Sequence, residues 1–352
     1  MSRAAFSALP RFATTGIGSL PHAEPAAALA AVREAALDVP YWPQLPRRSF
    51  LELMVPQAAR AIPFLAIDER SRRVTAVPAD GRPAKLAETY ERVLSGDAAR
   101  FALSPAEAAA WAPFVAETAG CPAVKGQLTG PVTLALGAVD EQERAIFFDA
   151  GLRDAATQAT AAAARYQAET LGAARRLVIV SADEPTLGVL GTAAYLGVTR
   201  EEAQGALATV LGAIREAGAI AGVHCCGAGE WELVAAAGAD VLFADAFAYG
   251  SSLVAAARSL GPFLARGGRI GWGLVPTDEA HVGATVDEIL ERWRDTEAAL
   301  VRAGLEREAL RAGSLLTPAC GCGSLAPAAA EDVWMKLRLL RARLHGETGR
   351  GR

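Results

Sequence analysis

The side chains best suited to chemistry gather in two short stretches of the sequence, HCC and TPACG. His224 and Cys226 are two residues apart, so on a β-strand both point to one face while Cys225 points to the other. Thiolate sulfur and imidazole nitrogen are ligands that Zn²⁺ prefers, and three protein ligands leave an open position, as in catalytic zinc sites. We therefore expect Cys320 to join His224 and Cys226 in a metal site. Asp245 is the candidate for a weak or exchangeable fourth ligand.

The cysteines also have other interpretations. Small thiols pack at buried strand ends, and the HCC stretch taken alone fits that interpretation equally well. Cys225 and Cys322 are either such packed thiols or members of a redox pair. Five cysteines in 352 residues do not indicate the disulfide framework of a secreted protein. Because clustered Cys beside His is more often metal-binding or catalytic in a reducing compartment, we favour the metal site.

Eight short apolar runs, each ending in Gly, Pro or a polar residue, predict β-strands. Between them lie segments with apolar residues at helical spacing, such as 147–173, 199–217 and 284–306. This alternation indicates an α/β protein with parallel strands, and eight such units predict a (β/α)₈ TIM barrel. The predicted strands are 12–19, 39–45, 123–130, 176–185, 219–227, 239–247, 268–275 and 313–321.

We expect residues 1–352 to form a single TIM-barrel domain, because no Ser/Gly linker and no internal repeat divides the chain. The interval 46–122 is too long for one crossover, so it predicts an insertion at the barrel rim between the second and third strands. It contains a helical pattern at 49–61 and a segment, LAIDERSRRVTAVPADGRP, that is typical of a small hairpin. The stretch 327–346 predicts an amphipathic helix that closes the barrel.

Polar residues fall at the predicted C-terminal ends of the strands, which is where barrel enzymes build their active sites. This distribution favours an enzyme. The residues concerned are Ser19, Gln44, Gln127, Asp183, Glu184, His224, Cys226, Asp245 and Cys320.

Composition excludes several kinds of partner. The formal net charge is −4 and no dense Lys/Arg tract is present, so we do not expect nucleic-acid binding. No uninterrupted apolar span is long enough for a transmembrane helix, and the first residues lack the apolar core of a signal peptide, which favours a cytoplasmic location. The GQLTGP segment lacks the Lys-Ser/Thr of a P-loop, so nucleotide binding is not expected.

The sequence resembles the catalytic barrel of the cobalamin-independent methionine synthases, within the larger group that includes uroporphyrinogen decarboxylase. Each matching motif is short, but together they occur in the family's order and span nearly the whole chain. The motifs are TTGIGSLPH at 14–22, GQLTGPVTL at 126–134, DEPTLG at 183–188, HCC at 224–226, ADVLFAD at 239–245 and TPACG at 317–321.

This resemblance implies a zinc-dependent methyltransferase of methionine biosynthesis that methylates a thiol such as homocysteine. It implies that His224, Cys226 and Cys320 hold the zinc together with an acid at Asp245. The family's acid is Glu, so Asp245 is a shorter substitute. Thr317 stands where the family's last motif has Asn.

The resemblance also implies how the substrate is held. Ile17, Gly18 and Ser19 would bind its carboxylate through backbone N–H groups and the Ser19 hydroxyl. Asp183 would bind the amino group, and it is a candidate catalytic residue together with His224, Cys226 and Cys320. The adjacent Glu184 is a further candidate for substrate binding. The Asp-Glu-Pro run is also typical of a strand-end cap followed by a turn, which is the alternative for Glu184 in particular.

Two departures from the family pattern affect the substrates. After the second strand the family presents a carboxylate, whereas this chain has Arg47 and Arg48. Arginine favours carboxylate, sulfonate or phosphate groups, so Arg48 is a candidate for binding an anionic thiol. The full-length family also has an extra N-terminal barrel that helps to bind folate, for which we see no room here. We therefore expect the methyl donor to be a methylcorrinoid, a corrinoid protein or a methylfolate.

Two other functions remain open. A decarboxylase similar to the uroporphyrinogen branch needs no metal, and the Cys/His set argues against it. A non-catalytic protein that binds zinc or a corrinoid would instead carry a methyl group or cofactor. Four tight protein ligands, with no change in metal coordination on adding a thiol, would favour that last alternative.

Overall fold

A computed structural model describes residues 2–174, 176–192, 195 and 197–349. Seven parallel strands form one curled sheet, a half-barrel, in the order β1-β9-β8-β7-β6-β5-β4. Each strand is buried along its whole length, as in parallel sheets with both faces covered. The strands are β1 (Ala13–Thr14), β4 (Ala123–Thr129), β5 (Leu177–Asp183), β6 (Ile220–Cys225), β7 (Val241–Asp245), β8 (Arg269–Val275) and β9 (Ser314–Pro318).

These strands coincide with seven of the eight predicted ones, and the exception is 39–45. That segment forms isolated parallel bridges to both edges of the sheet instead of a regular strand. Pro40 and Pro43 explain the difference, since neither residue has the N–H that a continuous ladder requires. The regular strands thus form a half-barrel, and its closure into the predicted eight-stranded TIM barrel remains a prediction. The bridges pair Thr15 with Val39, Ser19 with Gln44, and Tyr41 with Lys125.

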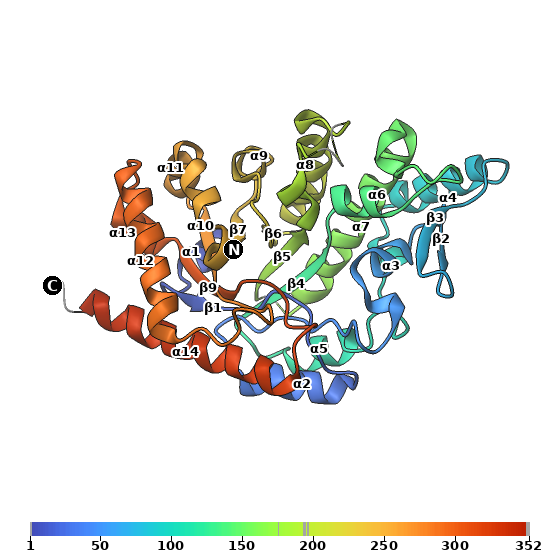
Figure 1. Cartoon of the computed structure of the whole chain (residues 1–352). Coiled ribbons are helices and arrows are strands. Elements are labelled where there is room, and N and C mark those ends of the chain that lie inside the picture. The colour runs from blue at the N-terminus through green and yellow to red at the C-terminus, as the bar shows by residue number, and fades with distance from the viewer. Residues whose placement is uncertain (1, 175, 193–194, 196, 350–352) are drawn as a thin grey trace.

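Helices make up about half of the chain and cover the outer face of the sheet (Figure 1). The last helix, predicted at 327–346, runs along β9 and β1. The helices outside the interval 46–122 are α1 (Ser2–Ser7), α2 (Pro25–Glu34), α6 (Pro131–Gly137), α7 (Ala150–Gly172), α8 (Arg200–Glu216), α9 (Trp231–Ala236), α10 (Ala246–Ala255), α11 (Ala257–Ala265), α12 (Val286–Arg302), α13 (Arg307–Ala312) and α14 (Pro327–Gly349), with the 3₁₀ turns η3 (Ile146–Phe148) and η4 (Pro185–Val189).

The interval 46–122 contains the predicted hairpin, which is confirmed as an antiparallel pair of strands. In Figure 1 this hairpin lies beside α3 and α4, away from β1 and β9. The elements of the interval are η1 (Phe50–Glu52), α3 (Met54–Ala59), β2 (Leu65–Asp68), β3 (Arg73–Ala76), α4 (Arg82–Leu94), η2 (Ala98–Phe101) and α5 (Trp111–Glu117).

The concave side of the sheet has its own apolar core, separate from the core beneath the helices. Phe243 of β7 fills its centre. Gly222 and Gly271 on the neighbouring strands make room for that ring, because a Cβ on either residue would lie within 2.8 Å or 2.2 Å of it. Phe6 of α1 and Val39 of the bridged segment belong to the same core. Within the described residues, no helix is long and apolar enough to span a membrane.

Candidate metal centre and substrate site

His224, Cys226 and Cys320 form a compact group at the carboxyl edge of the sheet. Each offers one ligand atom, and the three atoms lie within 4.8 Å of one another. His224 lies near the end of β6, Cys226 follows that strand, and Cys320 follows β9. Parallel strands direct all their carboxyl ends to one edge, which is how residues so distant in sequence meet. The structure therefore brings together the three predicted ligands.

The hydrogen bonds of His224 fit a metal ligand. Its side chain is buried, and Nδ1 lies 3.0 Å from the carbonyl oxygen of Phe243. Because a carbonyl only accepts, Nδ1 carries a proton, and Nε2 is the ring nitrogen that remains for a metal. Nε2 is itself buried and has no hydrogen-bond partner. A buried acceptor left without a partner costs free energy, and histidine ligands are commonly oriented by such a carbonyl. This arrangement therefore suits a metal better than a packed strand end.

The two cysteines of the group differ in protonation. A hydrogen bond from Cys320 lowers the pKa of Cys226 to about 4, and His224 acts in the same direction against burial. The same contact raises the pKa of Cys320 well above its ordinary value. Although burial opposes it, the contact with Cys226 raises the pKa of His224. One sulfur is thus a thiolate at neutral pH, which is the form that binds metals.

Asp245 lies at the end of β7 but is not part of the 4.8 Å group. Its Oδ1 accepts the backbone N–H of Ala248 at 2.8 Å and so caps α10. Burial raises the pKa of Asp245 to about 6, and the charges of Cys226 and His224 also act on it. A role as fourth ligand would depend on its second oxygen and remains a prediction.

Asp183 ends β5 and is the register neighbour of His224 on β6. The Ser181 hydroxyl donates to Oδ1 at 2.8 Å, and no further hydrogen bond to this carboxylate is recorded among the described residues. Burial raises the pKa of Asp183, while the charges of Lys125 and His224 oppose that shift. Asp183 is therefore placed beside the three ligands with an oxygen free for a substrate donor.

Glu184 is fully buried. Its backbone N–H donates to the carbonyl of His224 at 2.7 Å, while its side chain lies against the start of α6. Its Oε1 accepts the N–H of Val132 at 2.9 Å. Its Oε2 accepts both the N–H and the hydroxyl of Thr133, at 2.7 and 2.6 Å. These bonds satisfy N–H groups that a helix leaves without internal partners. Of the two interpretations of the Asp-Glu-Pro run, the cap describes Glu184.

Ile17, Gly18 and Ser19 follow β1 and lie against the loop that carries Cys320. The carbonyl of Ser19 accepts the N–H of Cys322 at 2.8 Å. Its hydroxyl accepts the N–H of Gly323 at 3.2 Å. A Cβ on Gly321 would clash with the same hydroxyl, since it would lie 2.1 Å from Oγ. The predicted carboxylate-binding segment is therefore joined to the loop that carries Cys320.

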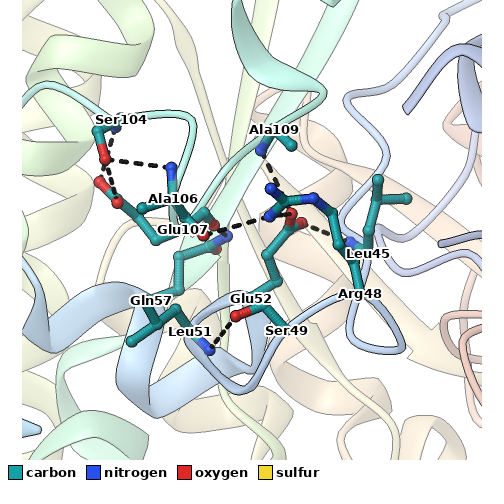
Figure 2. Close-up of polar contacts among 10 residues, drawn as sticks. All are labelled: Leu45, Arg48, Ser49, Leu51, Glu52, Gln57, Ser104, Ala106, Glu107 and Ala109. Atoms are coloured by element: carbon teal, nitrogen blue, oxygen red, sulfur yellow. Dashed lines mark hydrogen bonds and ion pairs between the residues drawn. The ribbon is translucent and has the colours of Figure 1, made fainter. Parts of the chain in front are cut away.

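Arg48 already has partners within the protein, as Figure 2 shows. One nitrogen lies 3.1 Å from Oε1 of the buried Glu52 and 3.3 Å from the carbonyl oxygen of Ala106. Glu52 also accepts the N–H of Leu45 at 2.9 Å. Arg47 donates to three carbonyls in the loop 323–325. Both arginines thus brace loops, and Glu52 is a buried carboxylate of this region that the sequence analysis did not identify.

The remaining cysteines are buried or half-buried free thiols, and none of the five forms a disulfide. Burial raises the pKa of Cys225 and of Cys322 to about 12. Both are therefore neutral at pH 7. Cys225 lies in the core beneath the helices, on the opposite face from His224, as its position in the strand predicted.

Sequence reasoning also missed Lys125, which is fully buried in β4. Its Nζ donates to the carbonyl of Ile17 at 2.6 Å and to Oε1 of Gln127 at 3.3 Å. The available signal was a lysine in the middle of the apolar run AVKGQLTG. Burial lowers the pKa of Lys125 to about 8, against the opposing charge of Asp183.

Comparison with models of known protein families and with curated proteins finds no match to this chain. The geometry of the site therefore carries the functional argument.

Proposed function

We propose that this protein is a zinc-dependent methyltransferase that methylates a thiol substrate. The observation that carries the proposal is the grouping of one ligand atom each from His224, Cys226 and Cys320 within 4.8 Å of one another, together with the lack of a hydrogen-bond partner for the buried Nε2 of His224. Three such ligands at the edge of a curled parallel sheet match an open catalytic site more closely than a closed structural one. The bridges made by 39–45 also lead us to regard the sheet as a (β/α)₈ barrel with one irregular strand.

His224, Cys226 and Cys320 would hold the zinc. When bound, zinc supplies positive charge that favours the thiolate form of a substrate thiol. Because Cys226 is already a thiolate, metal binding would require the loss of only one further thiol proton, that of Cys320. The carbonyl of Phe243 keeps the imidazole in the tautomer that binding requires.

The charged groups favour an amino-acid thiol, resembling homocysteine, over a sulfonate or phosphate thiol. The carboxylate of Asp183 has an oxygen available for a substrate ammonium group. Arg47 and Arg48, which would have favoured an anionic group, are engaged by protein carbonyls and Glu52. The backbone of the segment Ile17–Ser19 is the candidate site for the substrate carboxylate.

In the reaction, the substrate sulfur attacks the methyl carbon of the donor. A sulfur–carbon bond forms, the bond between donor and methyl carbon breaks, and the donor leaves with its electron pair. The thiol proton is lost to solvent. The chain's residues contribute by position, because holding the thiol in line with the methyl carbon removes much of the entropic barrier. A methylcorrinoid, a corrinoid protein or a methylfolate would serve as donor.

Methyl transfer to homocysteine, with methylcobalamin or methyltetrahydrofolate as donor, tests this function in the zinc-loaded protein. We expect Cys226→Ser and Cys320→Ser each to abolish metal binding and transfer together. Cys225→Ala, adjacent in sequence but on the opposite face, should retain both. Zinc retention without transfer from either donor, and without any response of the metal to added thiol, would favour the non-catalytic alternative.

A further inference from the structure

Lys125 is a buried cation that the proposed reaction does not use. Its side chain is 0% exposed in the interior of the sheet, with Nζ 5.4 Å from the centre of the Phe243 ring. Burying an ammonium group costs free energy unless its charge and N–H groups are compensated. An apolar side chain would occupy the same space without that cost, so the charge calls for a functional explanation.

The best hydrogen bond of Lys125 is to the segment that follows β1. Nζ lies 2.6 Å from the carbonyl oxygen of Ile17, a short distance typical of a charged donor. Two residues later, the Ser19 hydroxyl accepts the N–H of Gly323 at 3.2 Å. Gly323 belongs to the loop of Cys320. A continuous path of contacts therefore leads from the ammonium group to the loop that carries a ligand.

The same segment has little freedom on its other side. A Cβ on Gly18 would lie 2.6 Å from Oε1 of Gln44 and 3.3 Å from Gln127. Gln127 also accepts from Lys125 and donates to the carbonyl of Trp42 at 2.6 Å. The side chains of Gln44 and Gln127 thus pack against Gly18, and Lys125 is hydrogen-bonded to one of them.

Charge also connects Lys125 with the substrate site. Its positive charge opposes the effect of burial on Asp183 and so favours the carboxylate form. A carboxylate is what the binding of a substrate ammonium group requires. Lys125 is therefore placed to influence both ends of an amino-acid substrate without touching either.

We propose that Lys125 is a positioning residue, which holds Ile17–Ser19 in the conformation that receives the carboxylate of the thiol substrate. It acts through the carbonyl of Ile17 and contacts neither the metal ligands nor the thiol. The inference rests on the proposed function for the identity of that substrate.

Thiol titrations of the cobalt-loaded full-length protein test this role, with the cobalt absorption bands as readout. Lys125→Met removes the charge and leaves an unbranched side chain that is one heavy atom shorter. We expect it to retain the metal, to weaken homocysteine binding by about tenfold or more, and to change 2-mercaptoethanol binding by less than about twofold. Ile179→Met, at the register neighbour of Lys125, is the repacking control and should bind both thiols normally.

Hydrogen exchange gives a second readout that needs no substrate. In Lys125→Met, or in Lys125→Gln if the first variant fails to fold, exchange should increase in the peptide spanning 12–22 and not in α8. Unchanged exchange there, or equal weakening of both thiols, overturns the inference. If the wild-type protein binds metal but shows no response to any thiol, the proposed function fails, and the exchange result alone decides the role of Lys125.

Discussion

Asp183 and Glu184 are adjacent carboxylates with opposite surroundings. Asp183 lies in register with His224 and receives one hydrogen bond, from Ser181. Glu184 receives three from the start of α6. Successive residues of a strand point to opposite faces, so the side chain of Asp183 points toward the site and that of Glu184 points toward α6. The first carboxylate therefore lies where the proposed substrate binding requires it, whereas the second caps a helix.

Asp183→Asn should weaken binding of an amino-acid thiol without removing the metal. A hydrogen bond to a charged group contributes about 1.5–3 kcal/mol, which corresponds to a loss of roughly 10- to 150-fold in affinity. Titration of the cobalt-loaded variant with homocysteine measures this loss. A thiol that lacks the amino group, 2-mercaptoethanol, is the control and should bind unchanged. Equal losses for the two thiols would contradict the assignment of Asp183 to the amino group.

At the scale of elements, Glu184 connects the end of β5 to the start of α6, and its titration makes the free energy of unfolding depend on pH. Burial raises its pKa to about 7, above the value of 4.5 for an unperturbed glutamate. The folded state therefore binds this proton more tightly than the unfolded state. The resulting stabilisation is present below pH 4.5 and is lost as the pH rises through 7.

Glu184→Gln removes this titration and so isolates its effect. The stability of the wild type relative to Glu184→Gln should fall between pH 4.5 and 8, by on the order of 3 kcal/mol. Urea unfolding of both proteins across that range measures the difference. Parallel stability curves would show that Glu184 stays ionised in the folded protein.

The centre of the concave core depends on two glycines that accommodate one ring. In Gly271→Ala the new Cβ would lie 2.2 Å from Phe243 Cδ1, and overpacking of this kind costs about 1–3 kcal/mol. Gly212→Ala in α8 is the matched control, because its Cβ would meet nothing within 4 Å. Thermal unfolding should show a loss only for Gly271→Ala. Equal midpoints for the two variants would mean that Phe243 moves aside without cost.

The sequence predicted elements well wherever side-chain pattern alone decides them. Seven strands follow from short apolar runs with defined ends. The segment 39–45 has the same apolar character, but Pro40 and Pro43 interrupt its hydrogen bonds, a signal that was visible in the sequence but that the apolar pattern alone does not weigh. Of the two partners of Arg48, Glu52 is four residues along the chain, whereas the carbonyl of Ala106 comes from a loop that the sequence does not place beside it.

At the scale of the whole molecule, the site exists because one sheet gathers distant segments at one edge. His224 and Cys226 were recognisable as a pair from their spacing, whereas Cys320 needed the order of strands to be placed beside them. The role of Lys125 could not be predicted from the sequence, because it depends on a contact with the Ile17 carbonyl that only the folded sheet creates. Motif spacing thus predicts ligands, and topology predicts where they meet.

The most direct test of the central claim is the zinc content of purified, reduced protein compared with that of Cys320→Ser and Cys322→Ala. The geometry predicts about one zinc per wild-type chain and per Cys322→Ala chain, because Cys322 lies outside the ligand group. Cys320→Ser should lose most of the metal while remaining folded by circular dichroism. No zinc in the wild type, or an unchanged content in Cys320→Ser, would contradict the metal centre and the methyltransferase built on it.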